Sequence, residues 1–337
     1  MNFFKFRSLI LMTVLISLFF SCKKDNPSIP IEFKLPSKII NKIVVDPTGE
    51  KWFATEKGVV SYNGIKWTSY TDDQKLTTGS VSDFVFERLS GIKKLWIGTD
   101  VGLSAFEFGT SAISFVNYSS SNAGILADTV SAIGIDDRSV KYIGTSKGLS
   151  ILKDDKWDKF YGRKGEEILA NYKISSVAAT PNGYVYAATE GGGVSRFKYT
   201  DAVSGATTFN HPWALGLPSD TIYTVVADDI AQWYGTDKGV GYHSSEFTKS
   251  DWTTYTRADG LVCDTVYAIA KDLSGSMWFG THKGVSKLTV DKWLNYTTKN
   301  GLVANKVNSI AVDIDGSLWF GTDNGISHLI NNQWINY

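Results

Sequence analysis

Apolar and polar positions recur along this chain with a period of 41 to 47 residues. The pattern is clearest around a Thr that follows Gly or Ala and is followed three positions later by Gly, as in "MWFGTHKGVSKL" and "LWFGTDNGISHL". The anchor threonines are Thr55, Thr99, Thr145, Thr189, Thr236, Thr281 and Thr322. Repetition at this period is typical of repeat folds and predicts seven copies of one structural unit.

Each unit is predicted to contain four short strands. In the last unit they are the runs VNSIAVD, SLWFGT, GISHLI and QWINY, which are rich in β-branched and aromatic residues. The second and third runs are joined by Thr-x-x-Gly, in which Gly can take the positive φ of a tight hairpin. An aromatic pair such as Trp334 and Tyr337 ends most units, whereas the fourth unit keeps Phe209 alone.

Seven four-stranded units predict an all-β protein, a seven-bladed β-propeller of four-stranded antiparallel blades. We expect the propeller to span residues 35–337, with blades starting near residues 35, 76, 125, 169, 217, 261 and 302. The four strands of every blade are consecutive in sequence, so the ring should close by packing of blade 1 against blade 7. The Gly or Ala before each anchor Thr predicts that another segment approaches the backbone closely there.

The composite pattern L-x4-V-x2-I…D-x2-G-x2-W-x-G-T-x2-G-[VIL]-S…W-x2-Y resembles the two-component regulator propeller repeat. Repeats of this family occur in the extracytoplasmic sensor half of hybrid histidine kinases of Bacteroidota. The resemblance covers about 300 of the 337 residues and implies a propeller that binds ligands rather than transforming them. Because the seventh aromatic pair ends at Tyr337, we expect a stand-alone propeller without a kinase segment.

Residues 1–21 resemble a lipoprotein signal peptide. Lys5 and Arg7 precede an apolar run from Leu9 to Phe20, which is shorter than the roughly 20 residues of a membrane-spanning helix. Small Ser21 stands directly before Cys22, the expected site of lipid attachment, and the polar, Pro-rich residues 22–34 are expected to form a tether. We therefore expect a lipid-anchored protein of the cell envelope, in the outer membrane, with the side that it faces left open. A secreted protein with an incidental Cys is the alternative.

Charge and cysteine content exclude several classes. The chain has 34 Lys and Arg and 34 Asp and Glu, and removal of residues 1–21 leaves 32 basic against 34 acidic residues, so nothing favours nucleic acid as a partner. The two cysteines, Cys22 and Cys263, provide no intrachain disulfide framework, and Cys263 is expected to be buried. The four histidines share no blade position that would bring them together, and we predict neither a metal nor a cofactor.

One column of the repeat is a candidate ligand site. It lies two residues before the first Val or Ile of each first strand, where the seven side chains should surround one mouth of the central funnel. Its members are Lys38, Gly79, Asp128, Tyr172, Asp220, Asp264 and Asn305. The polar members are candidates to bind a cation or a polyhydroxyl ligand, or they cap turns at the start of the strands.

The connections between blades supply further candidates, because binding residues often lie on loops held by a rigid scaffold. They are Arg163, His211, Trp213 and Arg257. No linear catalytic motif is present and no catalytic residue is assigned. Three functions stay open: a recognition module for a glycan, a peptide or a partner protein; a glycan-active lyase or hydrolase with its residues in the funnel; and an envelope scaffold. Fold alone does not choose among them, and the family resemblance favours the non-enzymatic recognition module.

Overall fold

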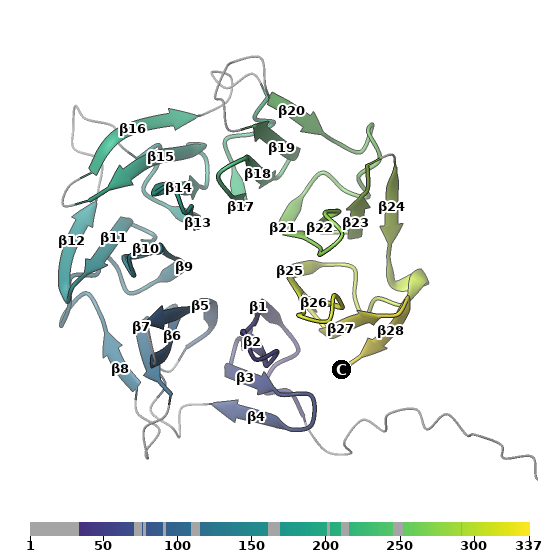
Figure 1. Ribbon diagram of the computed structural model, residues 1–337, viewed down its shortest axis with the longest axis horizontal. Coiled ribbons are helices and arrows are strands. Elements are labelled where there is room, and N and C mark those ends of the chain that lie inside the picture. Colours follow the sequence, from purple (N-terminus) through teal and green to yellow (C-terminus); the bar gives the residue numbers. More distant parts are fainter. Residues whose placement is uncertain are drawn as a thin grey trace, which may run out of the picture. The chain divides into compact units, whose positions relative to one another are not determined.

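Strands dominate the computed structural model, which describes residues 34–70, 76, 79–89, 92–108, 115–160, 169–200, 203–209, 216–244, 252–290 and 292–337. The unit Lys34–Tyr337 contains seven antiparallel sheets of four strands each (Figure 1). This confirms the predicted seven-bladed β-propeller.

The first four blades contain the following strands. They are β1 (Ile40–Val45), β2 (Lys51–Thr55), β3 (Gly58–Tyr62) and β4 (Trp67–Tyr70); β5 (Val81–Leu89), β6 (Ile92–Thr99), β7 (Gly102–Glu107) and β8 (Phe115–Tyr118); β9 (Val130–Ile135), β10 (Lys141–Thr145), β11 (Gly148–Lys153) and β12 (Lys156–Phe160); and β13 (Ile174–Ala179), β14 (Tyr184–Thr189), β15 (Val194–Tyr199) and β16 (Val203–Phe209).

The last three blades follow the same order. Their strands are β17 (Ile222–Ala227), β18 (Ala231–Thr236), β19 (Gly239–Ser244) and β20 (Trp252–Tyr255); β21 (Val266–Lys271), β22 (Met277–Thr281), β23 (Gly284–Leu288) and β24 (Trp293–Tyr296); and β25 (Val307–Val312), β26 (Leu318–Thr322), β27 (Gly325–Ile330) and β28 (Gln333–Asn336). A short 3-10 helix, η2 (Thr298–Asn300), lies between blades 6 and 7. In every sheet the first strand is innermost, so β1, β5, β9, β13, β17, β21 and β25 surround the centre (Figure 1).

The anchor Thr recurs because its buried hydroxyl holds the hairpin between the second and third strands. In blade 7, Thr322 Oγ1 donates to the carbonyl oxygen of Gly325 at 2.8 Å and accepts the N–H of Asn324 at 3.1 Å. Every anchor Thr donates in the same way, over 2.8–2.9 Å. Gly325 has a φ of 120°, which other residues adopt only with strain.

The small residue before each anchor Thr makes room for the next blade. A Cβ added at Gly98 would lie 2.6 Å from Cγ1 of Val130, the first residue of β9. At the ring closure, a Cβ on Gly321 would lie 2.7 Å from Cγ2 of Ile40, the first residue of β1. The predicted close approach is therefore confirmed, and the approaching segment is the innermost strand of the following blade.

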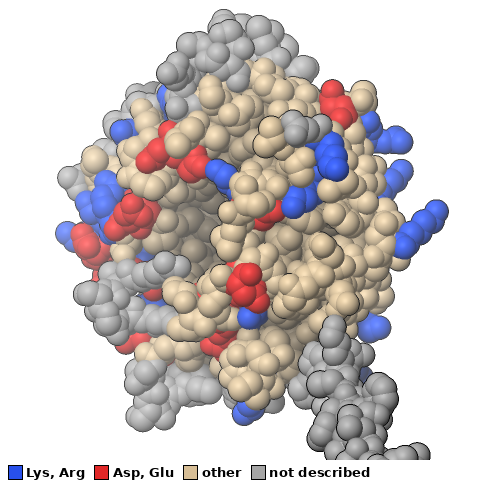
Figure 2. Space-filling view, turned by 45° about the vertical axis from the view of Figure 1, so that its right-hand side comes forward, with Lys and Arg blue, Asp and Glu red and all other residues tan. Residues whose placement is uncertain are grey.

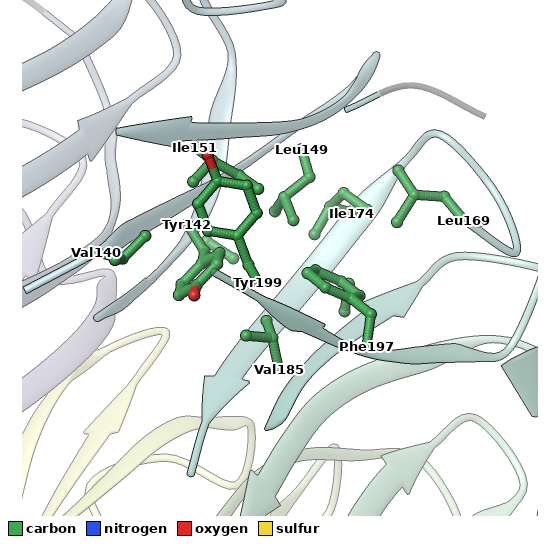
Figure 3. Packing of buried hydrophobic residues seen from close by; sticks show 11 residues of the cluster. Val140, Tyr142, Leu149, Ile151, Leu169, Ile174, Val185, Phe197 and Tyr199 are labelled. Atoms are coloured by element: carbon green, nitrogen blue, oxygen red, sulfur yellow. The ribbon is translucent and has the colours of Figure 1, made fainter. Parts of the chain in front are cut away.

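Apolar side chains fill the space between adjacent blades. Between blades 3 and 4, Tyr142 and Leu149 pack against Ile174, Val185 and Phe197 (Figure 3). All five are at most 1% exposed. Burial of one such aliphatic side chain contributes about 1.5–3 kcal/mol, so this repeated packing supplies most of the force that holds the ring together.

A β-bulge at the second residue of the innermost strand occurs in all seven blades. In five of them the side chain of the bulged residue donates a hydrogen bond to the carbonyl oxygen of the first residue of the next innermost strand. We call these bonds the inter-blade belt: Asn41 to Val81 (2.8 Å), Ser82 to Val130, Ser131 to Ile174 (2.5 Å), Ser175 to Ile222 (2.5 Å) and Asn308 to Ile40 (3.1 Å). Each such bond contributes about 0.5–1.5 kcal/mol.

The ring closes between blades 7 and 1 through polar and aromatic contacts. The N–H of Ile43 donates to Ser309 Oγ at 2.9 Å, and Lys51 Nζ lies 2.7 Å from Asp313 Oδ2. Trp319 packs against Phe53 of blade 1 and stacks on His328, with ring centroids 3.9 Å apart. Burial lowers the pKa of His328 to about 4, because the charged imidazolium would lose its hydration there.

Acidification should therefore loosen the closure. The unfolded chain binds a proton at His328 with a pKa of about 6.5, whereas the folded chain stays neutral there until about pH 4. Lowering the pH from 7 to 5 should reduce the free energy of unfolding by about 2 kcal/mol through this group alone. Urea denaturation of the wild type and of His328→Phe at both pH values measures the difference. An equal loss in the two proteins would assign the pH dependence to another group.

Candidate functional site

Three side chains of the predicted funnel-mouth column cap the loops that precede their own strands. Asp128 Oδ1 accepts the N–H of Ser120 at 2.6 Å, Asp264 Oδ1 that of Arg257 at 2.7 Å, and Asn305 Oδ1 that of Thr298 at 2.9 Å. The neutral amide of Asn305 makes the same bond as the two carboxylates, so the bond requires an acceptor rather than a charge. Hydrogen bonding to the connections between blades therefore explains why these three positions are polar, as in the turn-capping alternative.

The same column also links adjacent blades through its backbone. The carbonyl oxygens of Lys38 and Asp264 accept N–H groups of the preceding blades' hairpins, from Gly325 and Gly239, both at 2.7 Å. The carbonyl oxygen of Asp220 accepts from Gly191 and Gly193 in blade 4. In these three blades the backbone at this position has a structural role, whichever side chain the residue carries.

The electrostatics of Asp128 do not follow the expectation of coupled carboxylates. Hydrogen bonds from Ser120 lower the pKa of Asp128, whereas like charges sharing one mouth would raise the pKa of at least one member. Tyr172 is exposed, and Gly79 lies so close to Asp100 that an added Cβ would be 2.1 Å from Oδ1 of that residue. The role of Asp128, Tyr172, Asp220, Asp264 and Asn305 in ligand binding stays a prediction.

The other predicted positions are distributed as follows. The side chain of Arg257 is exposed on the connection between blades 5 and 6. Arg163, His211, Trp213 and Cys22 lie outside the described residues. Cys263 is buried, as expected, and His243 and His328 are buried within the blades. Among the described residues no group of three or more His, Cys, Asp or Glu side chains could hold a metal ion.

The column of bulged residues contains two tyrosines that the sequence interpretation missed. In chain order this column reads Asn41, Ser82, Ser131, Ser175, Tyr223, Tyr267 and Asn308. Within the described part of the chain, neither Tyr donates to the carbonyl oxygen of the next innermost strand as the other five side chains do. The belt is therefore interrupted between blades 5 and 7. The two tyrosines are visible in the sequence when the residues directly after the first Val or Ile of the seven units are compared.

Tyr223 and Tyr267 form an aromatic pair with polar neighbours. Their ring centroids are 5.1 Å apart with planes inclined by 53°, and both side chains are partly exposed. The ring of His282 lies 6.4 Å from that of Tyr267 in an edge-on arrangement. Lys306 Nζ lies 5.4 Å from the same ring, within reach of a cation–π interaction. This funnel-mouth cluster of Tyr223, Tyr267, His282 and Lys306 combines aromatic faces, hydroxyl groups and hydrogen-bond donors.

The charges around the cluster are mixed. Burial raises the pKa of Tyr223, and the nearby carboxylates Asp237 and Glu190 raise it further. Lys173 partly offsets them, and its Nζ lies 2.6 Å from Glu190 Oε2. Figure 2 shows a hollowed face on which acidic and basic side chains are interspersed rather than gathered by sign. The cluster is therefore distinguished by the arrangement of its side chains and not by a broad electrostatic potential of one sign.

Comparison with known proteins agrees with the fold and the repeat. Residues 301–324 match the family model of the two-component regulator propeller. Similar solved structures include one described as the extracellular domain of a hybrid two-component system, BT3049 from B. thetaiotaomicron. It is 22% identical, with a TM-score of 0.72, over 88% of this chain and 39% of that chain. The family resemblance seen in the sequence is thereby confirmed.

Two further structures resemble the chain. PorZ of Porphyromonas gingivalis, described as an essential bacterial surface component of the type-IX secretion system, is 20% identical with a TM-score of 0.69, over 88% of this chain and 47% of that chain. A streptogramin B lyase is 14% identical with a TM-score of 0.67, over 90% of this chain and 96% of that chain. At these identities the likeness establishes the fold, and the chain spans less than half the length of BT3049 and PorZ. Comparison with curated proteins gives no match.

Substitution of Asp264 should separate capping from charge. Asp264→Asn keeps the oxygen that accepts from Arg257 and should leave the melting temperature unchanged. Asp264→Ala removes that oxygen and should lower the free energy of unfolding by about 1 kcal/mol. Urea denaturation of both variants measures these effects. A loss in Asp264→Asn as large as that in Asp264→Ala would show that the carboxylate charge itself is needed.

Proposed function

We propose that the protein is a lipid-anchored recognition module of the cell envelope that binds a ligand at the funnel-mouth cluster. The observation that carries this proposal is the replacement of two belt donors by Tyr223 and Tyr267. Five blades use this position to bond to the next blade, and each bond stabilises the ring. Two adjacent blades lack such bonds among the described residues and present aromatic rings instead, which contact each other across the seam and are partly exposed.

The arrangement suits binding better than chemistry. Tyr223 and Tyr267 lie on the innermost strands of blades that are packed on both sides, so their positions are rigid and cost little ordering entropy on binding. Tyrosine combines a large apolar face with a polar hydroxyl, which favours contacts with amphipathic ligands. The funnel-mouth cluster contains no pair of carboxylates, the groups that most glycoside hydrolases use, so recognition is preferred to hydrolysis.

The anchoring part of the proposal is supported by the sequence around Ser21 and Cys22 and by similar proteins that are described as extracellular or as surface components. We propose that Cys22 carries the lipid, that residues 22–34 are the tether, and that the protein resides in the outer membrane. Within the described residues, no helix is long and apolar enough to cross a membrane.

Replacement of Cys22 tests the anchor. Cys22→Ala should move the protein from the membrane fraction to the soluble envelope fraction, because two or three acyl chains supply most of its membrane affinity. Ser28→Ala in the tether is the matched control and should leave the protein with the membranes. Intact-mass measurement of the mature wild type should show acyl chains on an N-terminal Cys22. An unmodified thiol, or cleavage at another residue, would exclude the lipid anchor.

Replacement of the tyrosines tests recognition at the funnel-mouth cluster. The Cys22→Ala protein is applied to arrays of oligosaccharides and of peptides, with and without Tyr223→Ser and Tyr267→Ser. Serine is the belt residue of blades 2 to 4, so these substitutions should leave the melting temperature unchanged or raise it. We expect at least one class of bound probe to be lost. Binding that is equal in both proteins would place recognition elsewhere on the propeller, and the absence of any bound probe would count against recognition itself.

A further inference from the structure

Two neighbouring columns of the repeat change together beside Tyr267. The column directly after the anchor Thr is acidic in five blades, as Glu56, Asp100, Glu190, Asp237 and Asp323, and is Ser146 in blade 3. In blade 6 it is His282, whose backbone N–H donates to the carbonyl oxygen of Thr265 at 3.1 Å. The blade that carries Tyr267 therefore has an imidazole where most blades carry a carboxylate.

The column directly before the first Val or Ile holds Lys in blades 4 and 7, and the two lysines behave differently. In blade 4, Lys173 forms an ion pair with Glu190, the residue after the anchor Thr of its own blade, at 2.6 Å. In blade 7, Lys306 has Asp323 in the equivalent place, but no ion pair joins Lys306 to any described residue. Its ammonium group lies over Tyr267 of the preceding blade instead.

These changes have one electrostatic consequence. Blade 6 has His282 where most blades have a carboxylate, and Lys306 forms no ion pair with Asp323 of its own blade. Two groups beside Tyr267 can therefore donate hydrogen bonds to an anion. A cation on a flexible stem is a common partner of carboxylates and sulfates, and the bond is stronger where one partner is partly shielded from water. Blade 4 shows that the repeat can neutralise a lysine at this position, so the arrangement in blade 7 is not imposed by the fold.

The aromatic pair narrows the chemistry of the rest of the ligand. The phenol hydroxyls of Tyr223 and Tyr267 have no hydrogen-bond partner among the described residues, and their rings are partly exposed. A saccharide ring offers a C–H face for aromatic packing and equatorial hydroxyls for phenol groups. Peptide recognition would use an apolar groove or a free strand edge, and the funnel-mouth cluster contains no aliphatic side chain.

From these contacts we infer that the funnel-mouth cluster binds an acidic saccharide. Tyr223 and Tyr267 pack against the sugar rings, and Lys306 together with His282 binds the carboxylate or sulfate. This inference rests on the proposed recognition function and specifies its ligand.

Isothermal titration calorimetry with defined tetrasaccharides tests the inference. The probes are tetragalacturonate, a hyaluronan tetrasaccharide, a tetrasulfated chondroitin-type tetrasaccharide and neutral cellotetraose, applied to the full mature chain with Cys22→Ala. At least one acidic probe should bind, and cellotetraose should bind about tenfold more weakly or not at all, because it lacks the charged hydrogen-bond acceptor. The affinity for the acidic probe should fall as salt is added.

Variants test separately the residues that bind the acidic group and those that pack against the sugar rings. Lys306→Gln should weaken binding of the acidic probe about tenfold and reduce its salt dependence. Lys147→Gln removes one charge from the hairpin between β10 and β11 of blade 3, a blade that contributes no residue to the cluster, and should leave the affinity unchanged. Tyr223→Ser with Tyr267→Ser should abolish binding without lowering the melting temperature, whereas Ser82→Ala should lower the melting temperature and leave binding intact.

Several outcomes would overturn the inference in distinguishable ways. Equal binding of cellotetraose, or full affinity in Lys306→Gln, would exclude the acidic group while leaving recognition at the tyrosines in place. Equal binding of a hexaglutamate peptide would exclude the saccharide. If no acidic tetrasaccharide binds while another array probe is lost in the double tyrosine variant, the proposed function stands and the ligand class is wrong.

Discussion

The packing of the first residue of each innermost strand against the Gly or Ala of the preceding blade is the contact on which the propeller depends. At Gly98 and Gly321 there is no space for a Cβ, so the second strand of one blade packs directly against the innermost strand of the next. The approach brings the bulged residues within reach of the next blade and allows the belt to form. It also fixes the positions at which Tyr223 and Tyr267 face the funnel. The same contact is present at the ring closure, where Gly321 of blade 7 packs against Ile40 of blade 1.

The seven blades could be predicted because the hairpin imposes the same local requirements every time. A buried Thr that bonds to Gly three residues later admits few substitutes, so its period remains visible in the sequence. The bulge could not be predicted in the same way, because it arises from the pairing of two strands and leaves no fixed residue type at the bulged position. Unless the bulge is known, the Asn, Ser and Tyr residues of that column have no evident common role in the sequence.

The funnel-mouth column shows the opposite difficulty. Asp128, Asp264 and Asn305 share a place in the repeat, and their polar side chains suggested a site. The structure gives each a bond to its own loop, and the acceptance of Asn in this role shows that geometry rather than charge is required. A polar residue type that recurs in several blades often has a structural role common to those blades. Tyr223 and His282 instead differ from the residues at the same position in most other blades. In a symmetric scaffold, the departures from symmetry are therefore more informative about ligand binding than the shared polar positions.

The interruption of the belt also makes the ring mechanically uneven. Blades 1 to 5 are bonded in series at their innermost strands, and Asn308 extends the series across the closure from blade 7 to blade 1. The seams from blade 5 to blade 6 and from blade 6 to blade 7 lack this bond within the described residues. They contain instead the contact between the rings of Tyr223 and Tyr267 and the contact of Lys306 with Tyr267. A molecule that contacted both Tyr223 and Tyr267 would span the first of these seams and act as an external fastener. Ligand occupancy would then be transmitted to the whole propeller as a change in stiffness rather than as a change in shape.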